Sequence, residues 1–440
     1  MQIEDSIFDE IRNNTFQKEI NITGVVRSYD GVVVTCDGFP APVGALCKIT
    51  DDSGNQSFAE LIGFGKGINK LVPYTGSSNV IAGARVELIS HGASAKIDDR
   101  CLGRAFDSLL QPLDQNPHTT FIDPISLDGE KINALDRRPI SEPFDTGVRA
   151  INGLLCIGRG QRVGIVAGSG VGKSVLLQMI TRHSHSDVIV VGLIGERSRE
   201  IGDFIRKTLT SEMISRLCII AEPAGSSPLR RIRAANLCTA ISEYFRKKGK
   251  NTLLIMDSLT RVAHARREIG LALGENASVR GYPPSAIAMI PELIERAGQG
   301  SSTEGSTTGI YTVLADSDDL NDPVVDSSRA ILDGHIVLSR MQSELGIYPA
   351  IDISSSISRV LSDITSVEQQ NNIREFRKYY SIYQENKDLL LLGGYKQGSD
   401  LEMDKAITLY DQMSKYIVQA PDEKCNIEDS IKVLSGVFNG

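Results

Sequence analysis

The stretch Ala167-Gly-Ser-Gly-Val-Gly-Lys-Ser174 decides the fold of this chain. The apolar run RVGIVA (162–167) leads into it, and a segment with helical spacing (173–182) follows it. The stretch matches G-x-x-x-x-G-K-[ST] except at its first position, where Ala167 replaces glycine. A glycine-rich turn between a strand and a helix folds around phosphate groups, whereas a purely structural turn has no need of the Lys-Ser pair. The stretch therefore predicts a P-loop.

Each residue type in this loop contributes to phosphate binding. The glycines let backbone N–H groups turn inward around a phosphate chain, and the start of the helix presents its positive end to the same phosphates. The lysine supplies a point charge for the β- and γ-phosphates, and the serine hydroxyl is a ligand for Mg²⁺. We predict that the nucleotide-binding residues are Gly168, Ser169, Gly170, Val171, Gly172, Lys173 and Ser174.

Two carboxylates follow other apolar runs and complete the predicted site. Asp257 ends the run LLIMD (253–257), which suits the metal-shell aspartate of a P-loop enzyme. Glu196 follows the run 187–195 and is expected at that strand's carboxyl end, where α/β sheets bind ligands. It suits the group that orients the attacking water. The alternative is a glutamate that complements a helix dipole, a role that Glu200 fits better.

The order of apolar runs predicts an α/β protein with further parts at both ends. After residue 150, buried runs alternate with helical segments, which indicates a parallel sheet covered on both faces. Short Val/Ile/Leu-rich runs separated by turn residues in 22–92 indicate a small β-barrel or sandwich, and helical spacing dominates after 365. The predicted boundaries are 1–21 for an N-terminal extension, then 22–92, 93–365 and 366–440. The extension is either a short amphipathic helix or a frayed terminus.

Composition excludes several classes of protein. Of the 440 residues, 41% are hydrophobic and 23% are charged, which excludes a disordered chain. The formal net charge of −8 provides no global basic field, so we interpret the basic clusters at 230–233 and 246–250 as solvated faces or subunit contacts and expect no nucleic-acid partner. The seven scattered cysteines, with no C-x-x-C pair, favour a reducing cytoplasm. The start of the chain lacks the apolar stretch of a secretory signal, and no apolar run approaches the ~20 residues of a membrane span.

Five stretches, taken in order, resemble the rotary-ATPase α/β family. They are AGSGVGKS (167–174), GERSRE (195–200), LLIMDSLTR (253–261), GYPPS (281–285) and YPAIDISSSISR (348–359). The resemblance runs from about residue 20 to 430 and implies a β-barrel, a RecA-like nucleotide domain and a C-terminal helical domain. Within the family the chain looks most like the type III secretion ATPases, especially the flagellar ones, because AGSGVGKS and GYPPSAIAMIPELIERAG are typical of that branch.

The resemblance implies roles for individual residues in ATP hydrolysis. Lys173 and Ser174 match the phosphate lysine and the Mg²⁺ ligand, and Asp257 matches the metal-shell aspartate. The remaining matches are the water-activating glutamate Glu196, its neighbour Arg197 at the γ-phosphate, the adenine-stacking Tyr348, and Arg359, which matches the arginine finger supplied by the neighbouring subunit.

The same resemblance implies an assembly and partners. We expect a homohexameric ring at the cytoplasmic face of the inner membrane, which energises the unloading and delivery of export substrates with their chaperones. The loop 315–323 resembles the one that touches a central coiled-coil stalk. Further expected partners are a stator-like regulator at the N-terminus and the membrane export gate.

Three alternatives stay open at this point. The first is the catalytic subunit of a proton-driven rotary ATP synthase, although no acidic lever loop of the DELSEED type follows residue 370. The second is a Rho-like RNA translocase, which predicts base-stacking aromatics in the barrel. Trp is absent, and 22–92 holds only Tyr29, Phe39, Phe58, Phe64 and Tyr74. The third is a non-catalytic nucleotide-holding subunit, against which Lys173 and Glu196 argue together.

Overall fold

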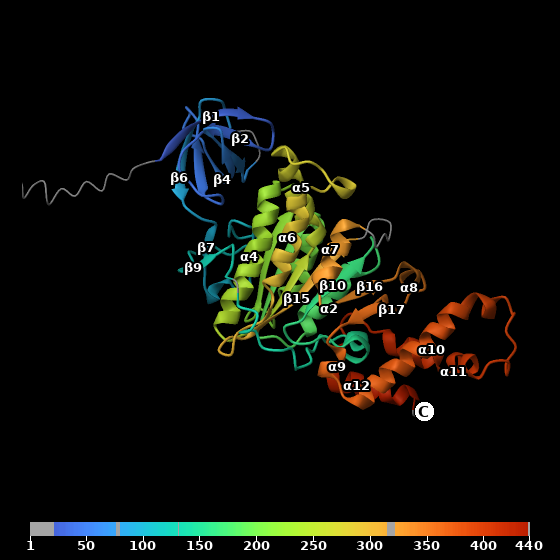
Figure 1. The fold of residues 1–440 in the computed structure, drawn as a ribbon. Helices are drawn as coiled ribbons and strands as arrows, with labels where there is room; N and C mark the ends of the chain where they lie inside the picture. The colour runs from blue at the N-terminus through green and yellow to red at the C-terminus, as the bar shows by residue number, and fades with distance from the viewer. Residues whose placement is uncertain (1–21, 76–79, 131, 315–321, 439–440) are drawn as a thin grey trace, which may run out of the picture. The chain divides into compact units, whose positions relative to one another are not determined.

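The computed structural model describes residues 22–75, 80–130, 132–314 and 322–438. The chain divides into two compact units, Met1–Ala93 and Ser94–Gly440, each of which is described by itself (Figure 1). The N-terminal helix considered for residues 1–20 lies outside the described residues, as does the loop 315–323 up to residue 321.

The first unit is a closed six-stranded barrel. Its residues alternate between the inside and the outside: in β3, Cys47 and Ile49 are buried, whereas Lys48 lies between them and pairs with Glu87 at 2.8 Å. This period of two is what a half-buried strand requires. The barrel order is β1-β2-β5-β4-β3-β6. The strands are β1 (Thr23–Tyr29), β2 (Val34–Asp37), β3 (Leu46–Thr50), β4 (Gln56–Gly65), β5 (Ile68–Pro73) and β6 (Arg85–Ser90). The predicted barrel is confirmed.

The second unit is built on a nine-stranded sheet in the order β17-β16-β10-β15-β13-β11-β12-β8, with β14 paired to β15. The strands from β16 to β8 run parallel, and β17 and β14 are antiparallel to their neighbours. The strands are β8 (Arg104–Phe106), β10 (Arg162–Ala167), β11 (Val188–Glu196), β12 (Leu217–Pro223), β13 (Asn251–Asp257), β14 (Gly298–Gln299), β15 (Ser306–Leu314), β16 (Gly334–Leu338) and β17 (Ile351–Ser358). The predicted parallel sheet is confirmed. A separate antiparallel pair joins β7 (Ser94–Ile97) to β9 (Asp123–Ser126).

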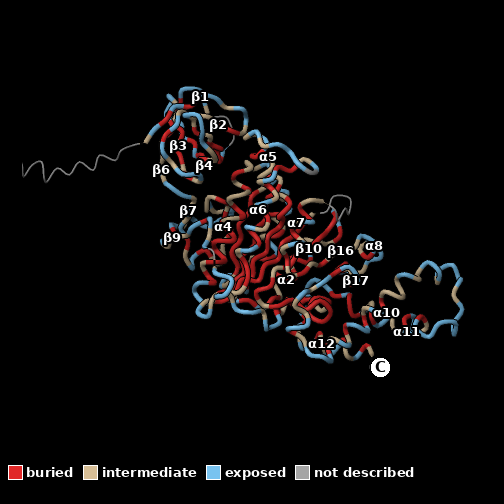
Figure 2. Tube along the Cα trace, in the orientation of Figure 1, coloured by how far each residue is buried: buried red, intermediate tan, exposed pale blue. Residues whose placement is uncertain are grey.

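Helices cover both faces of this sheet, which explains why its central strands are apolar throughout (Figures 1 and 2). In β13, Leu253 and Ile255 belong to the core shared with α2, while Leu254 and Met256 alternate with them and are equally buried. Helix α4 packs against β11 and β13. The helices in this part are α2 (Lys173–His183), α3 (Ser198–Thr208), α4 (Pro228–Lys247), α5 (Leu259–Ala272), α6 (Pro284–Glu295), α7 (Pro323–Ile331) and α8 (Arg340–Glu344).

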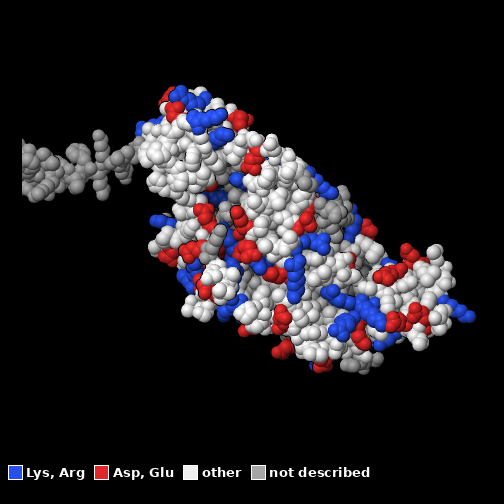
Figure 3. Space-filling model, viewed as in Figure 1, with Lys and Arg blue, Asp and Glu red and all other residues white. Residues whose placement is uncertain are grey.

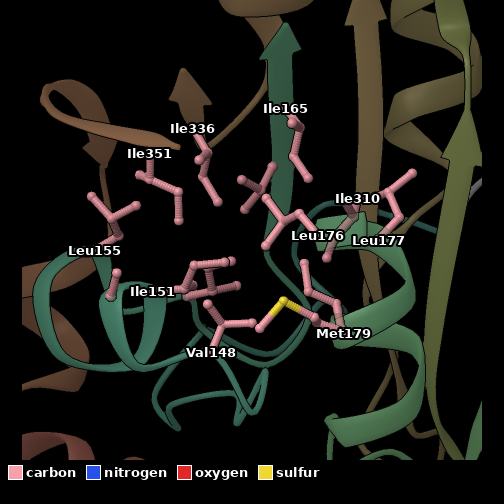
Figure 4. Close-up of a cluster of buried hydrophobic side chains, with 14 of the residues drawn as sticks. Val148, Ile151, Leu155, Ile165, Leu176, Leu177, Met179, Ile310, Ile336 and Ile351 are labelled. Atoms are coloured by element: carbon pink, nitrogen blue, oxygen red, sulfur yellow. The ribbon is translucent and has the colours of Figure 1, made fainter. Parts of the chain in front are cut away.

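One hydrophobic core reaches from the sheet into the C-terminal helices. Figure 4 shows Ile165, Ile310 and Ile336 of three neighbouring strands facing Leu176 of α2 and a short helical turn at Ile151–Leu155. The same core continues through buried side chains of the last helices: Ile373, Phe376, Tyr380, Met413, Tyr416 and Leu434. These helices are α9 (Leu361–Ile364), α10 (Val367–Leu391), α11 (Leu401–Ile417) and α12 (Ile427–Phe438). The predicted helical region is confirmed, while its boundary at 366 and the other domain boundaries remain predictions.

Candidate active site

The loop between β10 and α2 has the backbone geometry that its glycines predict. Gly170 and Gly172 have φ angles of +81° and +89°, which L side chains rarely adopt. Gly172 caps α2, whose first residue is Lys173. Val171 is almost fully buried in the core and anchors the loop, while Ser169 and Gly170 are exposed. The loop therefore presents its backbone to solvent at the start of a helix, which is the arrangement of an anion site.

Three further strands bring their carboxyl ends to the same edge of the sheet. Glu196 is the last residue of β11 and Asp257 the last of β13. Thr312 lies near the end of β15, which separates β10 from β13. Because these strands are parallel, all of their carboxyl ends lie beside the P-loop.

The Lys173 ammonium lies between two carboxylates. It forms an ion pair with Asp257 and a second one with Glu196, whose Oε1 is 3.3 Å from Nζ. The Thr312 hydroxyl donates a 2.6 Å hydrogen bond to Oδ1 of Asp257. The side chains of Lys173, Glu196 and Asp257 are only 11%, 14% and 5% exposed. The structure thus brings three of the predicted residues into one largely buried cluster.

The cluster changes the protonation of its members. Burial by itself lowers the pKa of Lys173, but the charges of Asp257 and Glu196 outweigh it, and the pKa of Lys173 lies above its ordinary value. Burial raises the pKa of Glu196, and the charge of Asp257 raises it further against the opposing effect of Lys173. Lys173 is therefore a permanent cation at neutral pH, and Glu196 is a stronger base than an exposed glutamate.

Tyr348 lies against the P-loop from the far end of the chain. A Cβ atom placed on Gly172 would stand 3.2 Å from Cε1 of the Tyr348 ring. The Tyr348 hydroxyl is 2.7 Å from the Ser343 hydroxyl, and the side chain is 42% exposed. An aromatic ring that is partly exposed and held by its hydroxyl is suited to stacking with a planar base.

Two predicted arginines lie away from this cluster. Arg197 caps the start of α3 with a side chain that is 85% exposed, and its described partner is Glu200 at 3.7 Å. Arg359 follows the last residue of the edge strand β17, is exposed, and donates a 3.3 Å hydrogen bond to the carbonyl of Arg329. The predicted positions of both groups at a γ-phosphate remain predictions.

Sequence reasoning missed two residues at this edge. Thr312 carries no motif signal, because one threonine in an apolar strand is common. The aliphatic part of the Arg261 side chain packs against the backbone of Gly195. A Cβ atom added to Gly195 would stand 2.7 Å from the Cβ atom of Arg261. The Nε of Arg261 is buried and has no hydrogen-bond partner within the described residues. Its position in LLIMDSLTR, four residues after Asp257, was a signal for it.

The oxygen donors at the site fit Mg²⁺ rather than a metal held by the protein alone. The described residues contain no group of three or more His, Cys, Asp and Glu side chains able to hold a metal ion. Mg²⁺ keeps several waters and takes one or two protein oxygens beside substrate phosphates. The hydroxyl of Ser174 at the start of α2 and the carboxylate of Asp257 are oxygens of this kind.

Comparisons with known proteins agree with this geometry. Residues 147–358 match the nucleotide-binding domain of the ATP synthase alpha/beta family, and residues 365–436 match the C-terminal domain of the type III secretion ATPase EscN. The flagellum-specific ATP synthase of Pseudomonas aeruginosa is 45% identical over 413 residues, which cover 93% of this chain and 92% of that protein. The chain belongs to the type III secretion branch of the ATP synthase alpha/beta family.

Further relatives support this membership. The flagellum-specific ATP synthase of Salmonella typhimurium is 44% identical to this chain, and the alignment covers 97% of each of the two proteins. The solved structure of the assembled ATPase EscN from enteropathogenic E. coli superposes with a TM-score of 0.89 at 39% identity, covering 94% of this chain and 99% of that one. A second structure shows EscN in complex with its central stalk EscO, with a TM-score of 0.86.

This member of the type III secretion branch is therefore a nucleotide-binding ATPase, as the sequence predicts. The match of 365–436 to the EscN C-terminal domain favours the export branch over the rotary ATP synthase considered above. Within the described part of the chain, every helix is too short or too polar to cross a membrane.

Proposed function

We propose that this ATPase hydrolyses Mg-ATP in a homohexameric ring at the base of a type III export apparatus, and that this apparatus is the flagellar one. The observation that carries the proposal is the meeting of Lys173, Glu196 and Asp257 beside the P-loop at the carboxyl edge of a parallel sheet. The flagellar assignment rests on the curated relatives from Pseudomonas aeruginosa, Salmonella typhimurium and Bacillus subtilis, which are flagellum-specific ATP synthases 40–45% identical to this chain.

In this proposal, hydrolysis depends on positioning and on charge. The backbone N–H groups of 168–174 hold the phosphate chain, and Lys173 neutralises charge on the β- and γ-phosphates. Glu196 orients the attacking water and accepts its proton. Its raised pKa makes it a better proton acceptor than an exposed carboxylate. Arg261, with its buried unpaired Nε, offers a donor toward the same edge.

Mg²⁺ would be held by Ser174 and Asp257. When bound, it would supply positive charge that stabilises the negative charge on the transferred phosphoryl group. Thr312 orients the Asp257 carboxylate through its 2.6 Å hydrogen bond. Tyr348 would stack on adenine, because its ring lies directly beside the P-loop backbone at Gly172.

The ring supplies what one chain lacks. Arg359 directly follows the edge strand of the sheet and is exposed, which suits an arginine that acts on the nucleotide of a neighbouring subunit. Arg197, also exposed, is proposed to lie at the γ-phosphate of its own site. If sites form between subunits, ATPase activity per chain rises steeply with protein concentration. Constant activity from dilute monomer to assembled ring would contradict the interface model.

The partners of the ring are proposed by analogy with the family. EscN has been solved with its central stalk EscO, and we propose a coiled-coil stalk that contacts the loop 315–323 of this chain. We also propose a stator-like regulator at the N-terminus, the export gate at the cytoplasmic face of the inner membrane, and export substrates with their chaperones.

Nucleic acid is not among the proposed partners. Figure 3 shows basic and acidic side chains interspersed on the visible face. Within the predicted basic clusters, Arg230 pairs with Asp107 and Glu222, Arg246 pairs with Glu304, and Lys248 pairs with Asp99. These pairs neutralise charge that a phosphate backbone would otherwise attract.

The decisive experiment has two parts. Lys173→Ala should abolish ATP hydrolysis and weaken nucleotide binding, and an unchanged turnover would remove the P-loop from the mechanism. Affinity capture from the native cell should then recover flagellar rod, hook and filament chaperones. Recovery of injectisome effectors instead would assign the ATPase to the other export system, and stimulation of its activity by RNA would favour a translocase.

A further inference from the structure

The loop between α11 and α12 (418–426) is tied to the nucleotide-binding part of the same unit by side chains far away in sequence. Arg149 donates to the carbonyl of Val418 at 3.3 Å and pairs with Glu423. Asn152 donates to the carbonyl of Cys425 at 3.0 Å. Because these residues precede β10, the loop is held against the segment that leads into the P-loop strand.

Gln419 lies at the centre of these contacts and is 3% exposed. Its Oε1 accepts a 2.7 Å hydrogen bond from the N–H of Arg149. Its Nε2 donates to the carbonyls of Gly147 at 2.9 Å and Glu423 at 2.8 Å. The side-chain amide therefore uses both of its donors and its acceptor, which fixes the orientation of this buried side chain in a loop that is otherwise mostly exposed.

The backbone of Gln419 contacts Tyr348, the residue proposed to stack on the base. Its N–H donates a 3.0 Å hydrogen bond to the carbonyl of Tyr348. Tyr348 is thus held at two ends: its hydroxyl contacts Ser343, and its carbonyl contacts Gln419. A shift of the loop at Gln419 moves the backbone from which the ring projects toward Gly172.

We propose that Gln419 is a positioning residue for the nucleotide base, which holds Tyr348 at the stacking distance through the α11–α12 loop. The inference rests on the proposed stacking role of Tyr348 and adds a residue from the C-terminal helical region. It implies that the position of α11 and α12 sets the affinity for the base and leaves the affinity for phosphates unchanged.

The test replaces Gln419 by Met, which keeps the volume and removes the three side-chain hydrogen bonds. Because the loop then loses the side-chain hydrogen bonds that fix its backbone beside Tyr348, KM and Kd for ATP should rise by roughly tenfold. The inhibition constant of tripolyphosphate, which has no base, and kcat at saturating ATP should stay within about twofold of the parent values. Gln412→Met, at an exposed glutamine of α11, is the matched control and should change none of these quantities.

A double-mutant cycle with Tyr348→Ala separates the possible outcomes. If Gln419 acts through Tyr348, Gln419→Met should weaken ATP binding in the parent and have little effect in the Tyr348→Ala background. Additive losses, or an equal loss of tripolyphosphate binding, would overturn the positioning role and leave the stacking role intact. If Tyr348→Ala itself leaves ATP binding unchanged, the stacking role fails, and the inference fails with it.

Discussion

The ring of Tyr348 lies against the backbone of Gly172, although 175 residues separate them along the chain. A Cβ atom on Gly172 would stand 3.2 Å from Cε1 and 3.3 Å from Cδ1 of that ring. Through this contact, the residue that caps the P-loop helix also bounds the surface proposed for the adenine base. Gly172 and the Tyr348 ring therefore form a shared wall, which borders both the phosphate end and the base end of the proposed site.

Replacing Gly172 by Ala should weaken ATP binding. The residue has a φ angle of +89°, and an L side chain in the left-handed region costs roughly 1–2 kcal/mol. The added methyl group also presses on Tyr348. Equilibrium binding of a fluorescent ATP analogue should show a loss of about tenfold. Gly436→Ala, in an open and exposed part of α12, should bind like the parent. Unchanged binding by Gly172→Ala would contradict the shared wall.

Glu196→Gln should keep ATP bound and slow its cleavage. The amide has the shape of the carboxylate but cannot accept a proton from water, so kcat should fall by ~10²–10⁴. Single-turnover cleavage and equilibrium binding measure the two effects separately. Glu385→Gln is the matched control, because Glu385 is exposed on α10 and belongs to no part of the proposed site. A variant at 196 that lost binding and kept turnover would show that the role is assigned wrongly.

The pH dependence of kcat should show the raised pKa of Glu196. As the pH falls, a base whose pKa lies above the ordinary value of 4.5 becomes protonated earlier than an exposed glutamate would. The acid limb of the kcat profile should therefore lie above pH 4.5, and the residual activity of Glu196→Gln should lack that limb. An acid limb that persists unchanged in the variant would assign it to another group.

Thr312→Val should raise the Mg²⁺ concentration needed for half-maximal activity. Valine has the shape of threonine but leaves the buried Asp257 carboxylate without its 2.6 Å donor, which costs ~1–3 kcal/mol. The carboxylate then keeps its ion pair with Lys173 but loses the contact that fixes its orientation toward a bound Mg²⁺. Thr312→Ser restores the hydroxyl and should restore the Mg²⁺ dependence. Equal Mg²⁺ titrations for valine and serine would show that Thr312 has only a packing role.

Arg359→Ala should retain ATP binding and lose nearly all hydrolysis, because an arginine finger contributes ~10³–10⁵ in rate. Arg359→Lys should recover little, since an ammonium lacks the planar fork. Mixing Arg359→Ala with Lys173→Ala subunits should restore part of the activity, because some interfaces then join an intact P-loop to an intact arginine. Arg374→Ala, at an exposed arginine of α10, should behave as the parent. If mixed rings form but stay inactive, there are two explanations: the arginine acts within its own chain, or the ring needs every site to be active. Counting the subunits of each kind in single rings decides between them.

Local pattern was sufficient for the central strands β10, β11 and β13 and for the P-loop. The run 162–167 is β10, with the bounds expected from its apolar residues, and the run 253–257 ends β13. Continuous burial on both faces leaves such strands few alternatives. The strand β8 was missed, because three residues in a connector carry too little periodicity to be recognised. It is a strand only because it pairs with β12.

The sequence by itself determined which groups are candidates for the chemistry: the loop 167–174, Glu196 and Asp257 belong to short motifs whose residue types suit phosphate, water and metal. Tertiary structure alone decided which groups support them. Thr312 orients Asp257, and Gln419 holds Tyr348, through hydrogen bonds between residues 55 and 71 positions apart. Such contacts depend on the order of strands in a sheet and on the packing of a distant loop, and neither leaves a periodic signal in the chain.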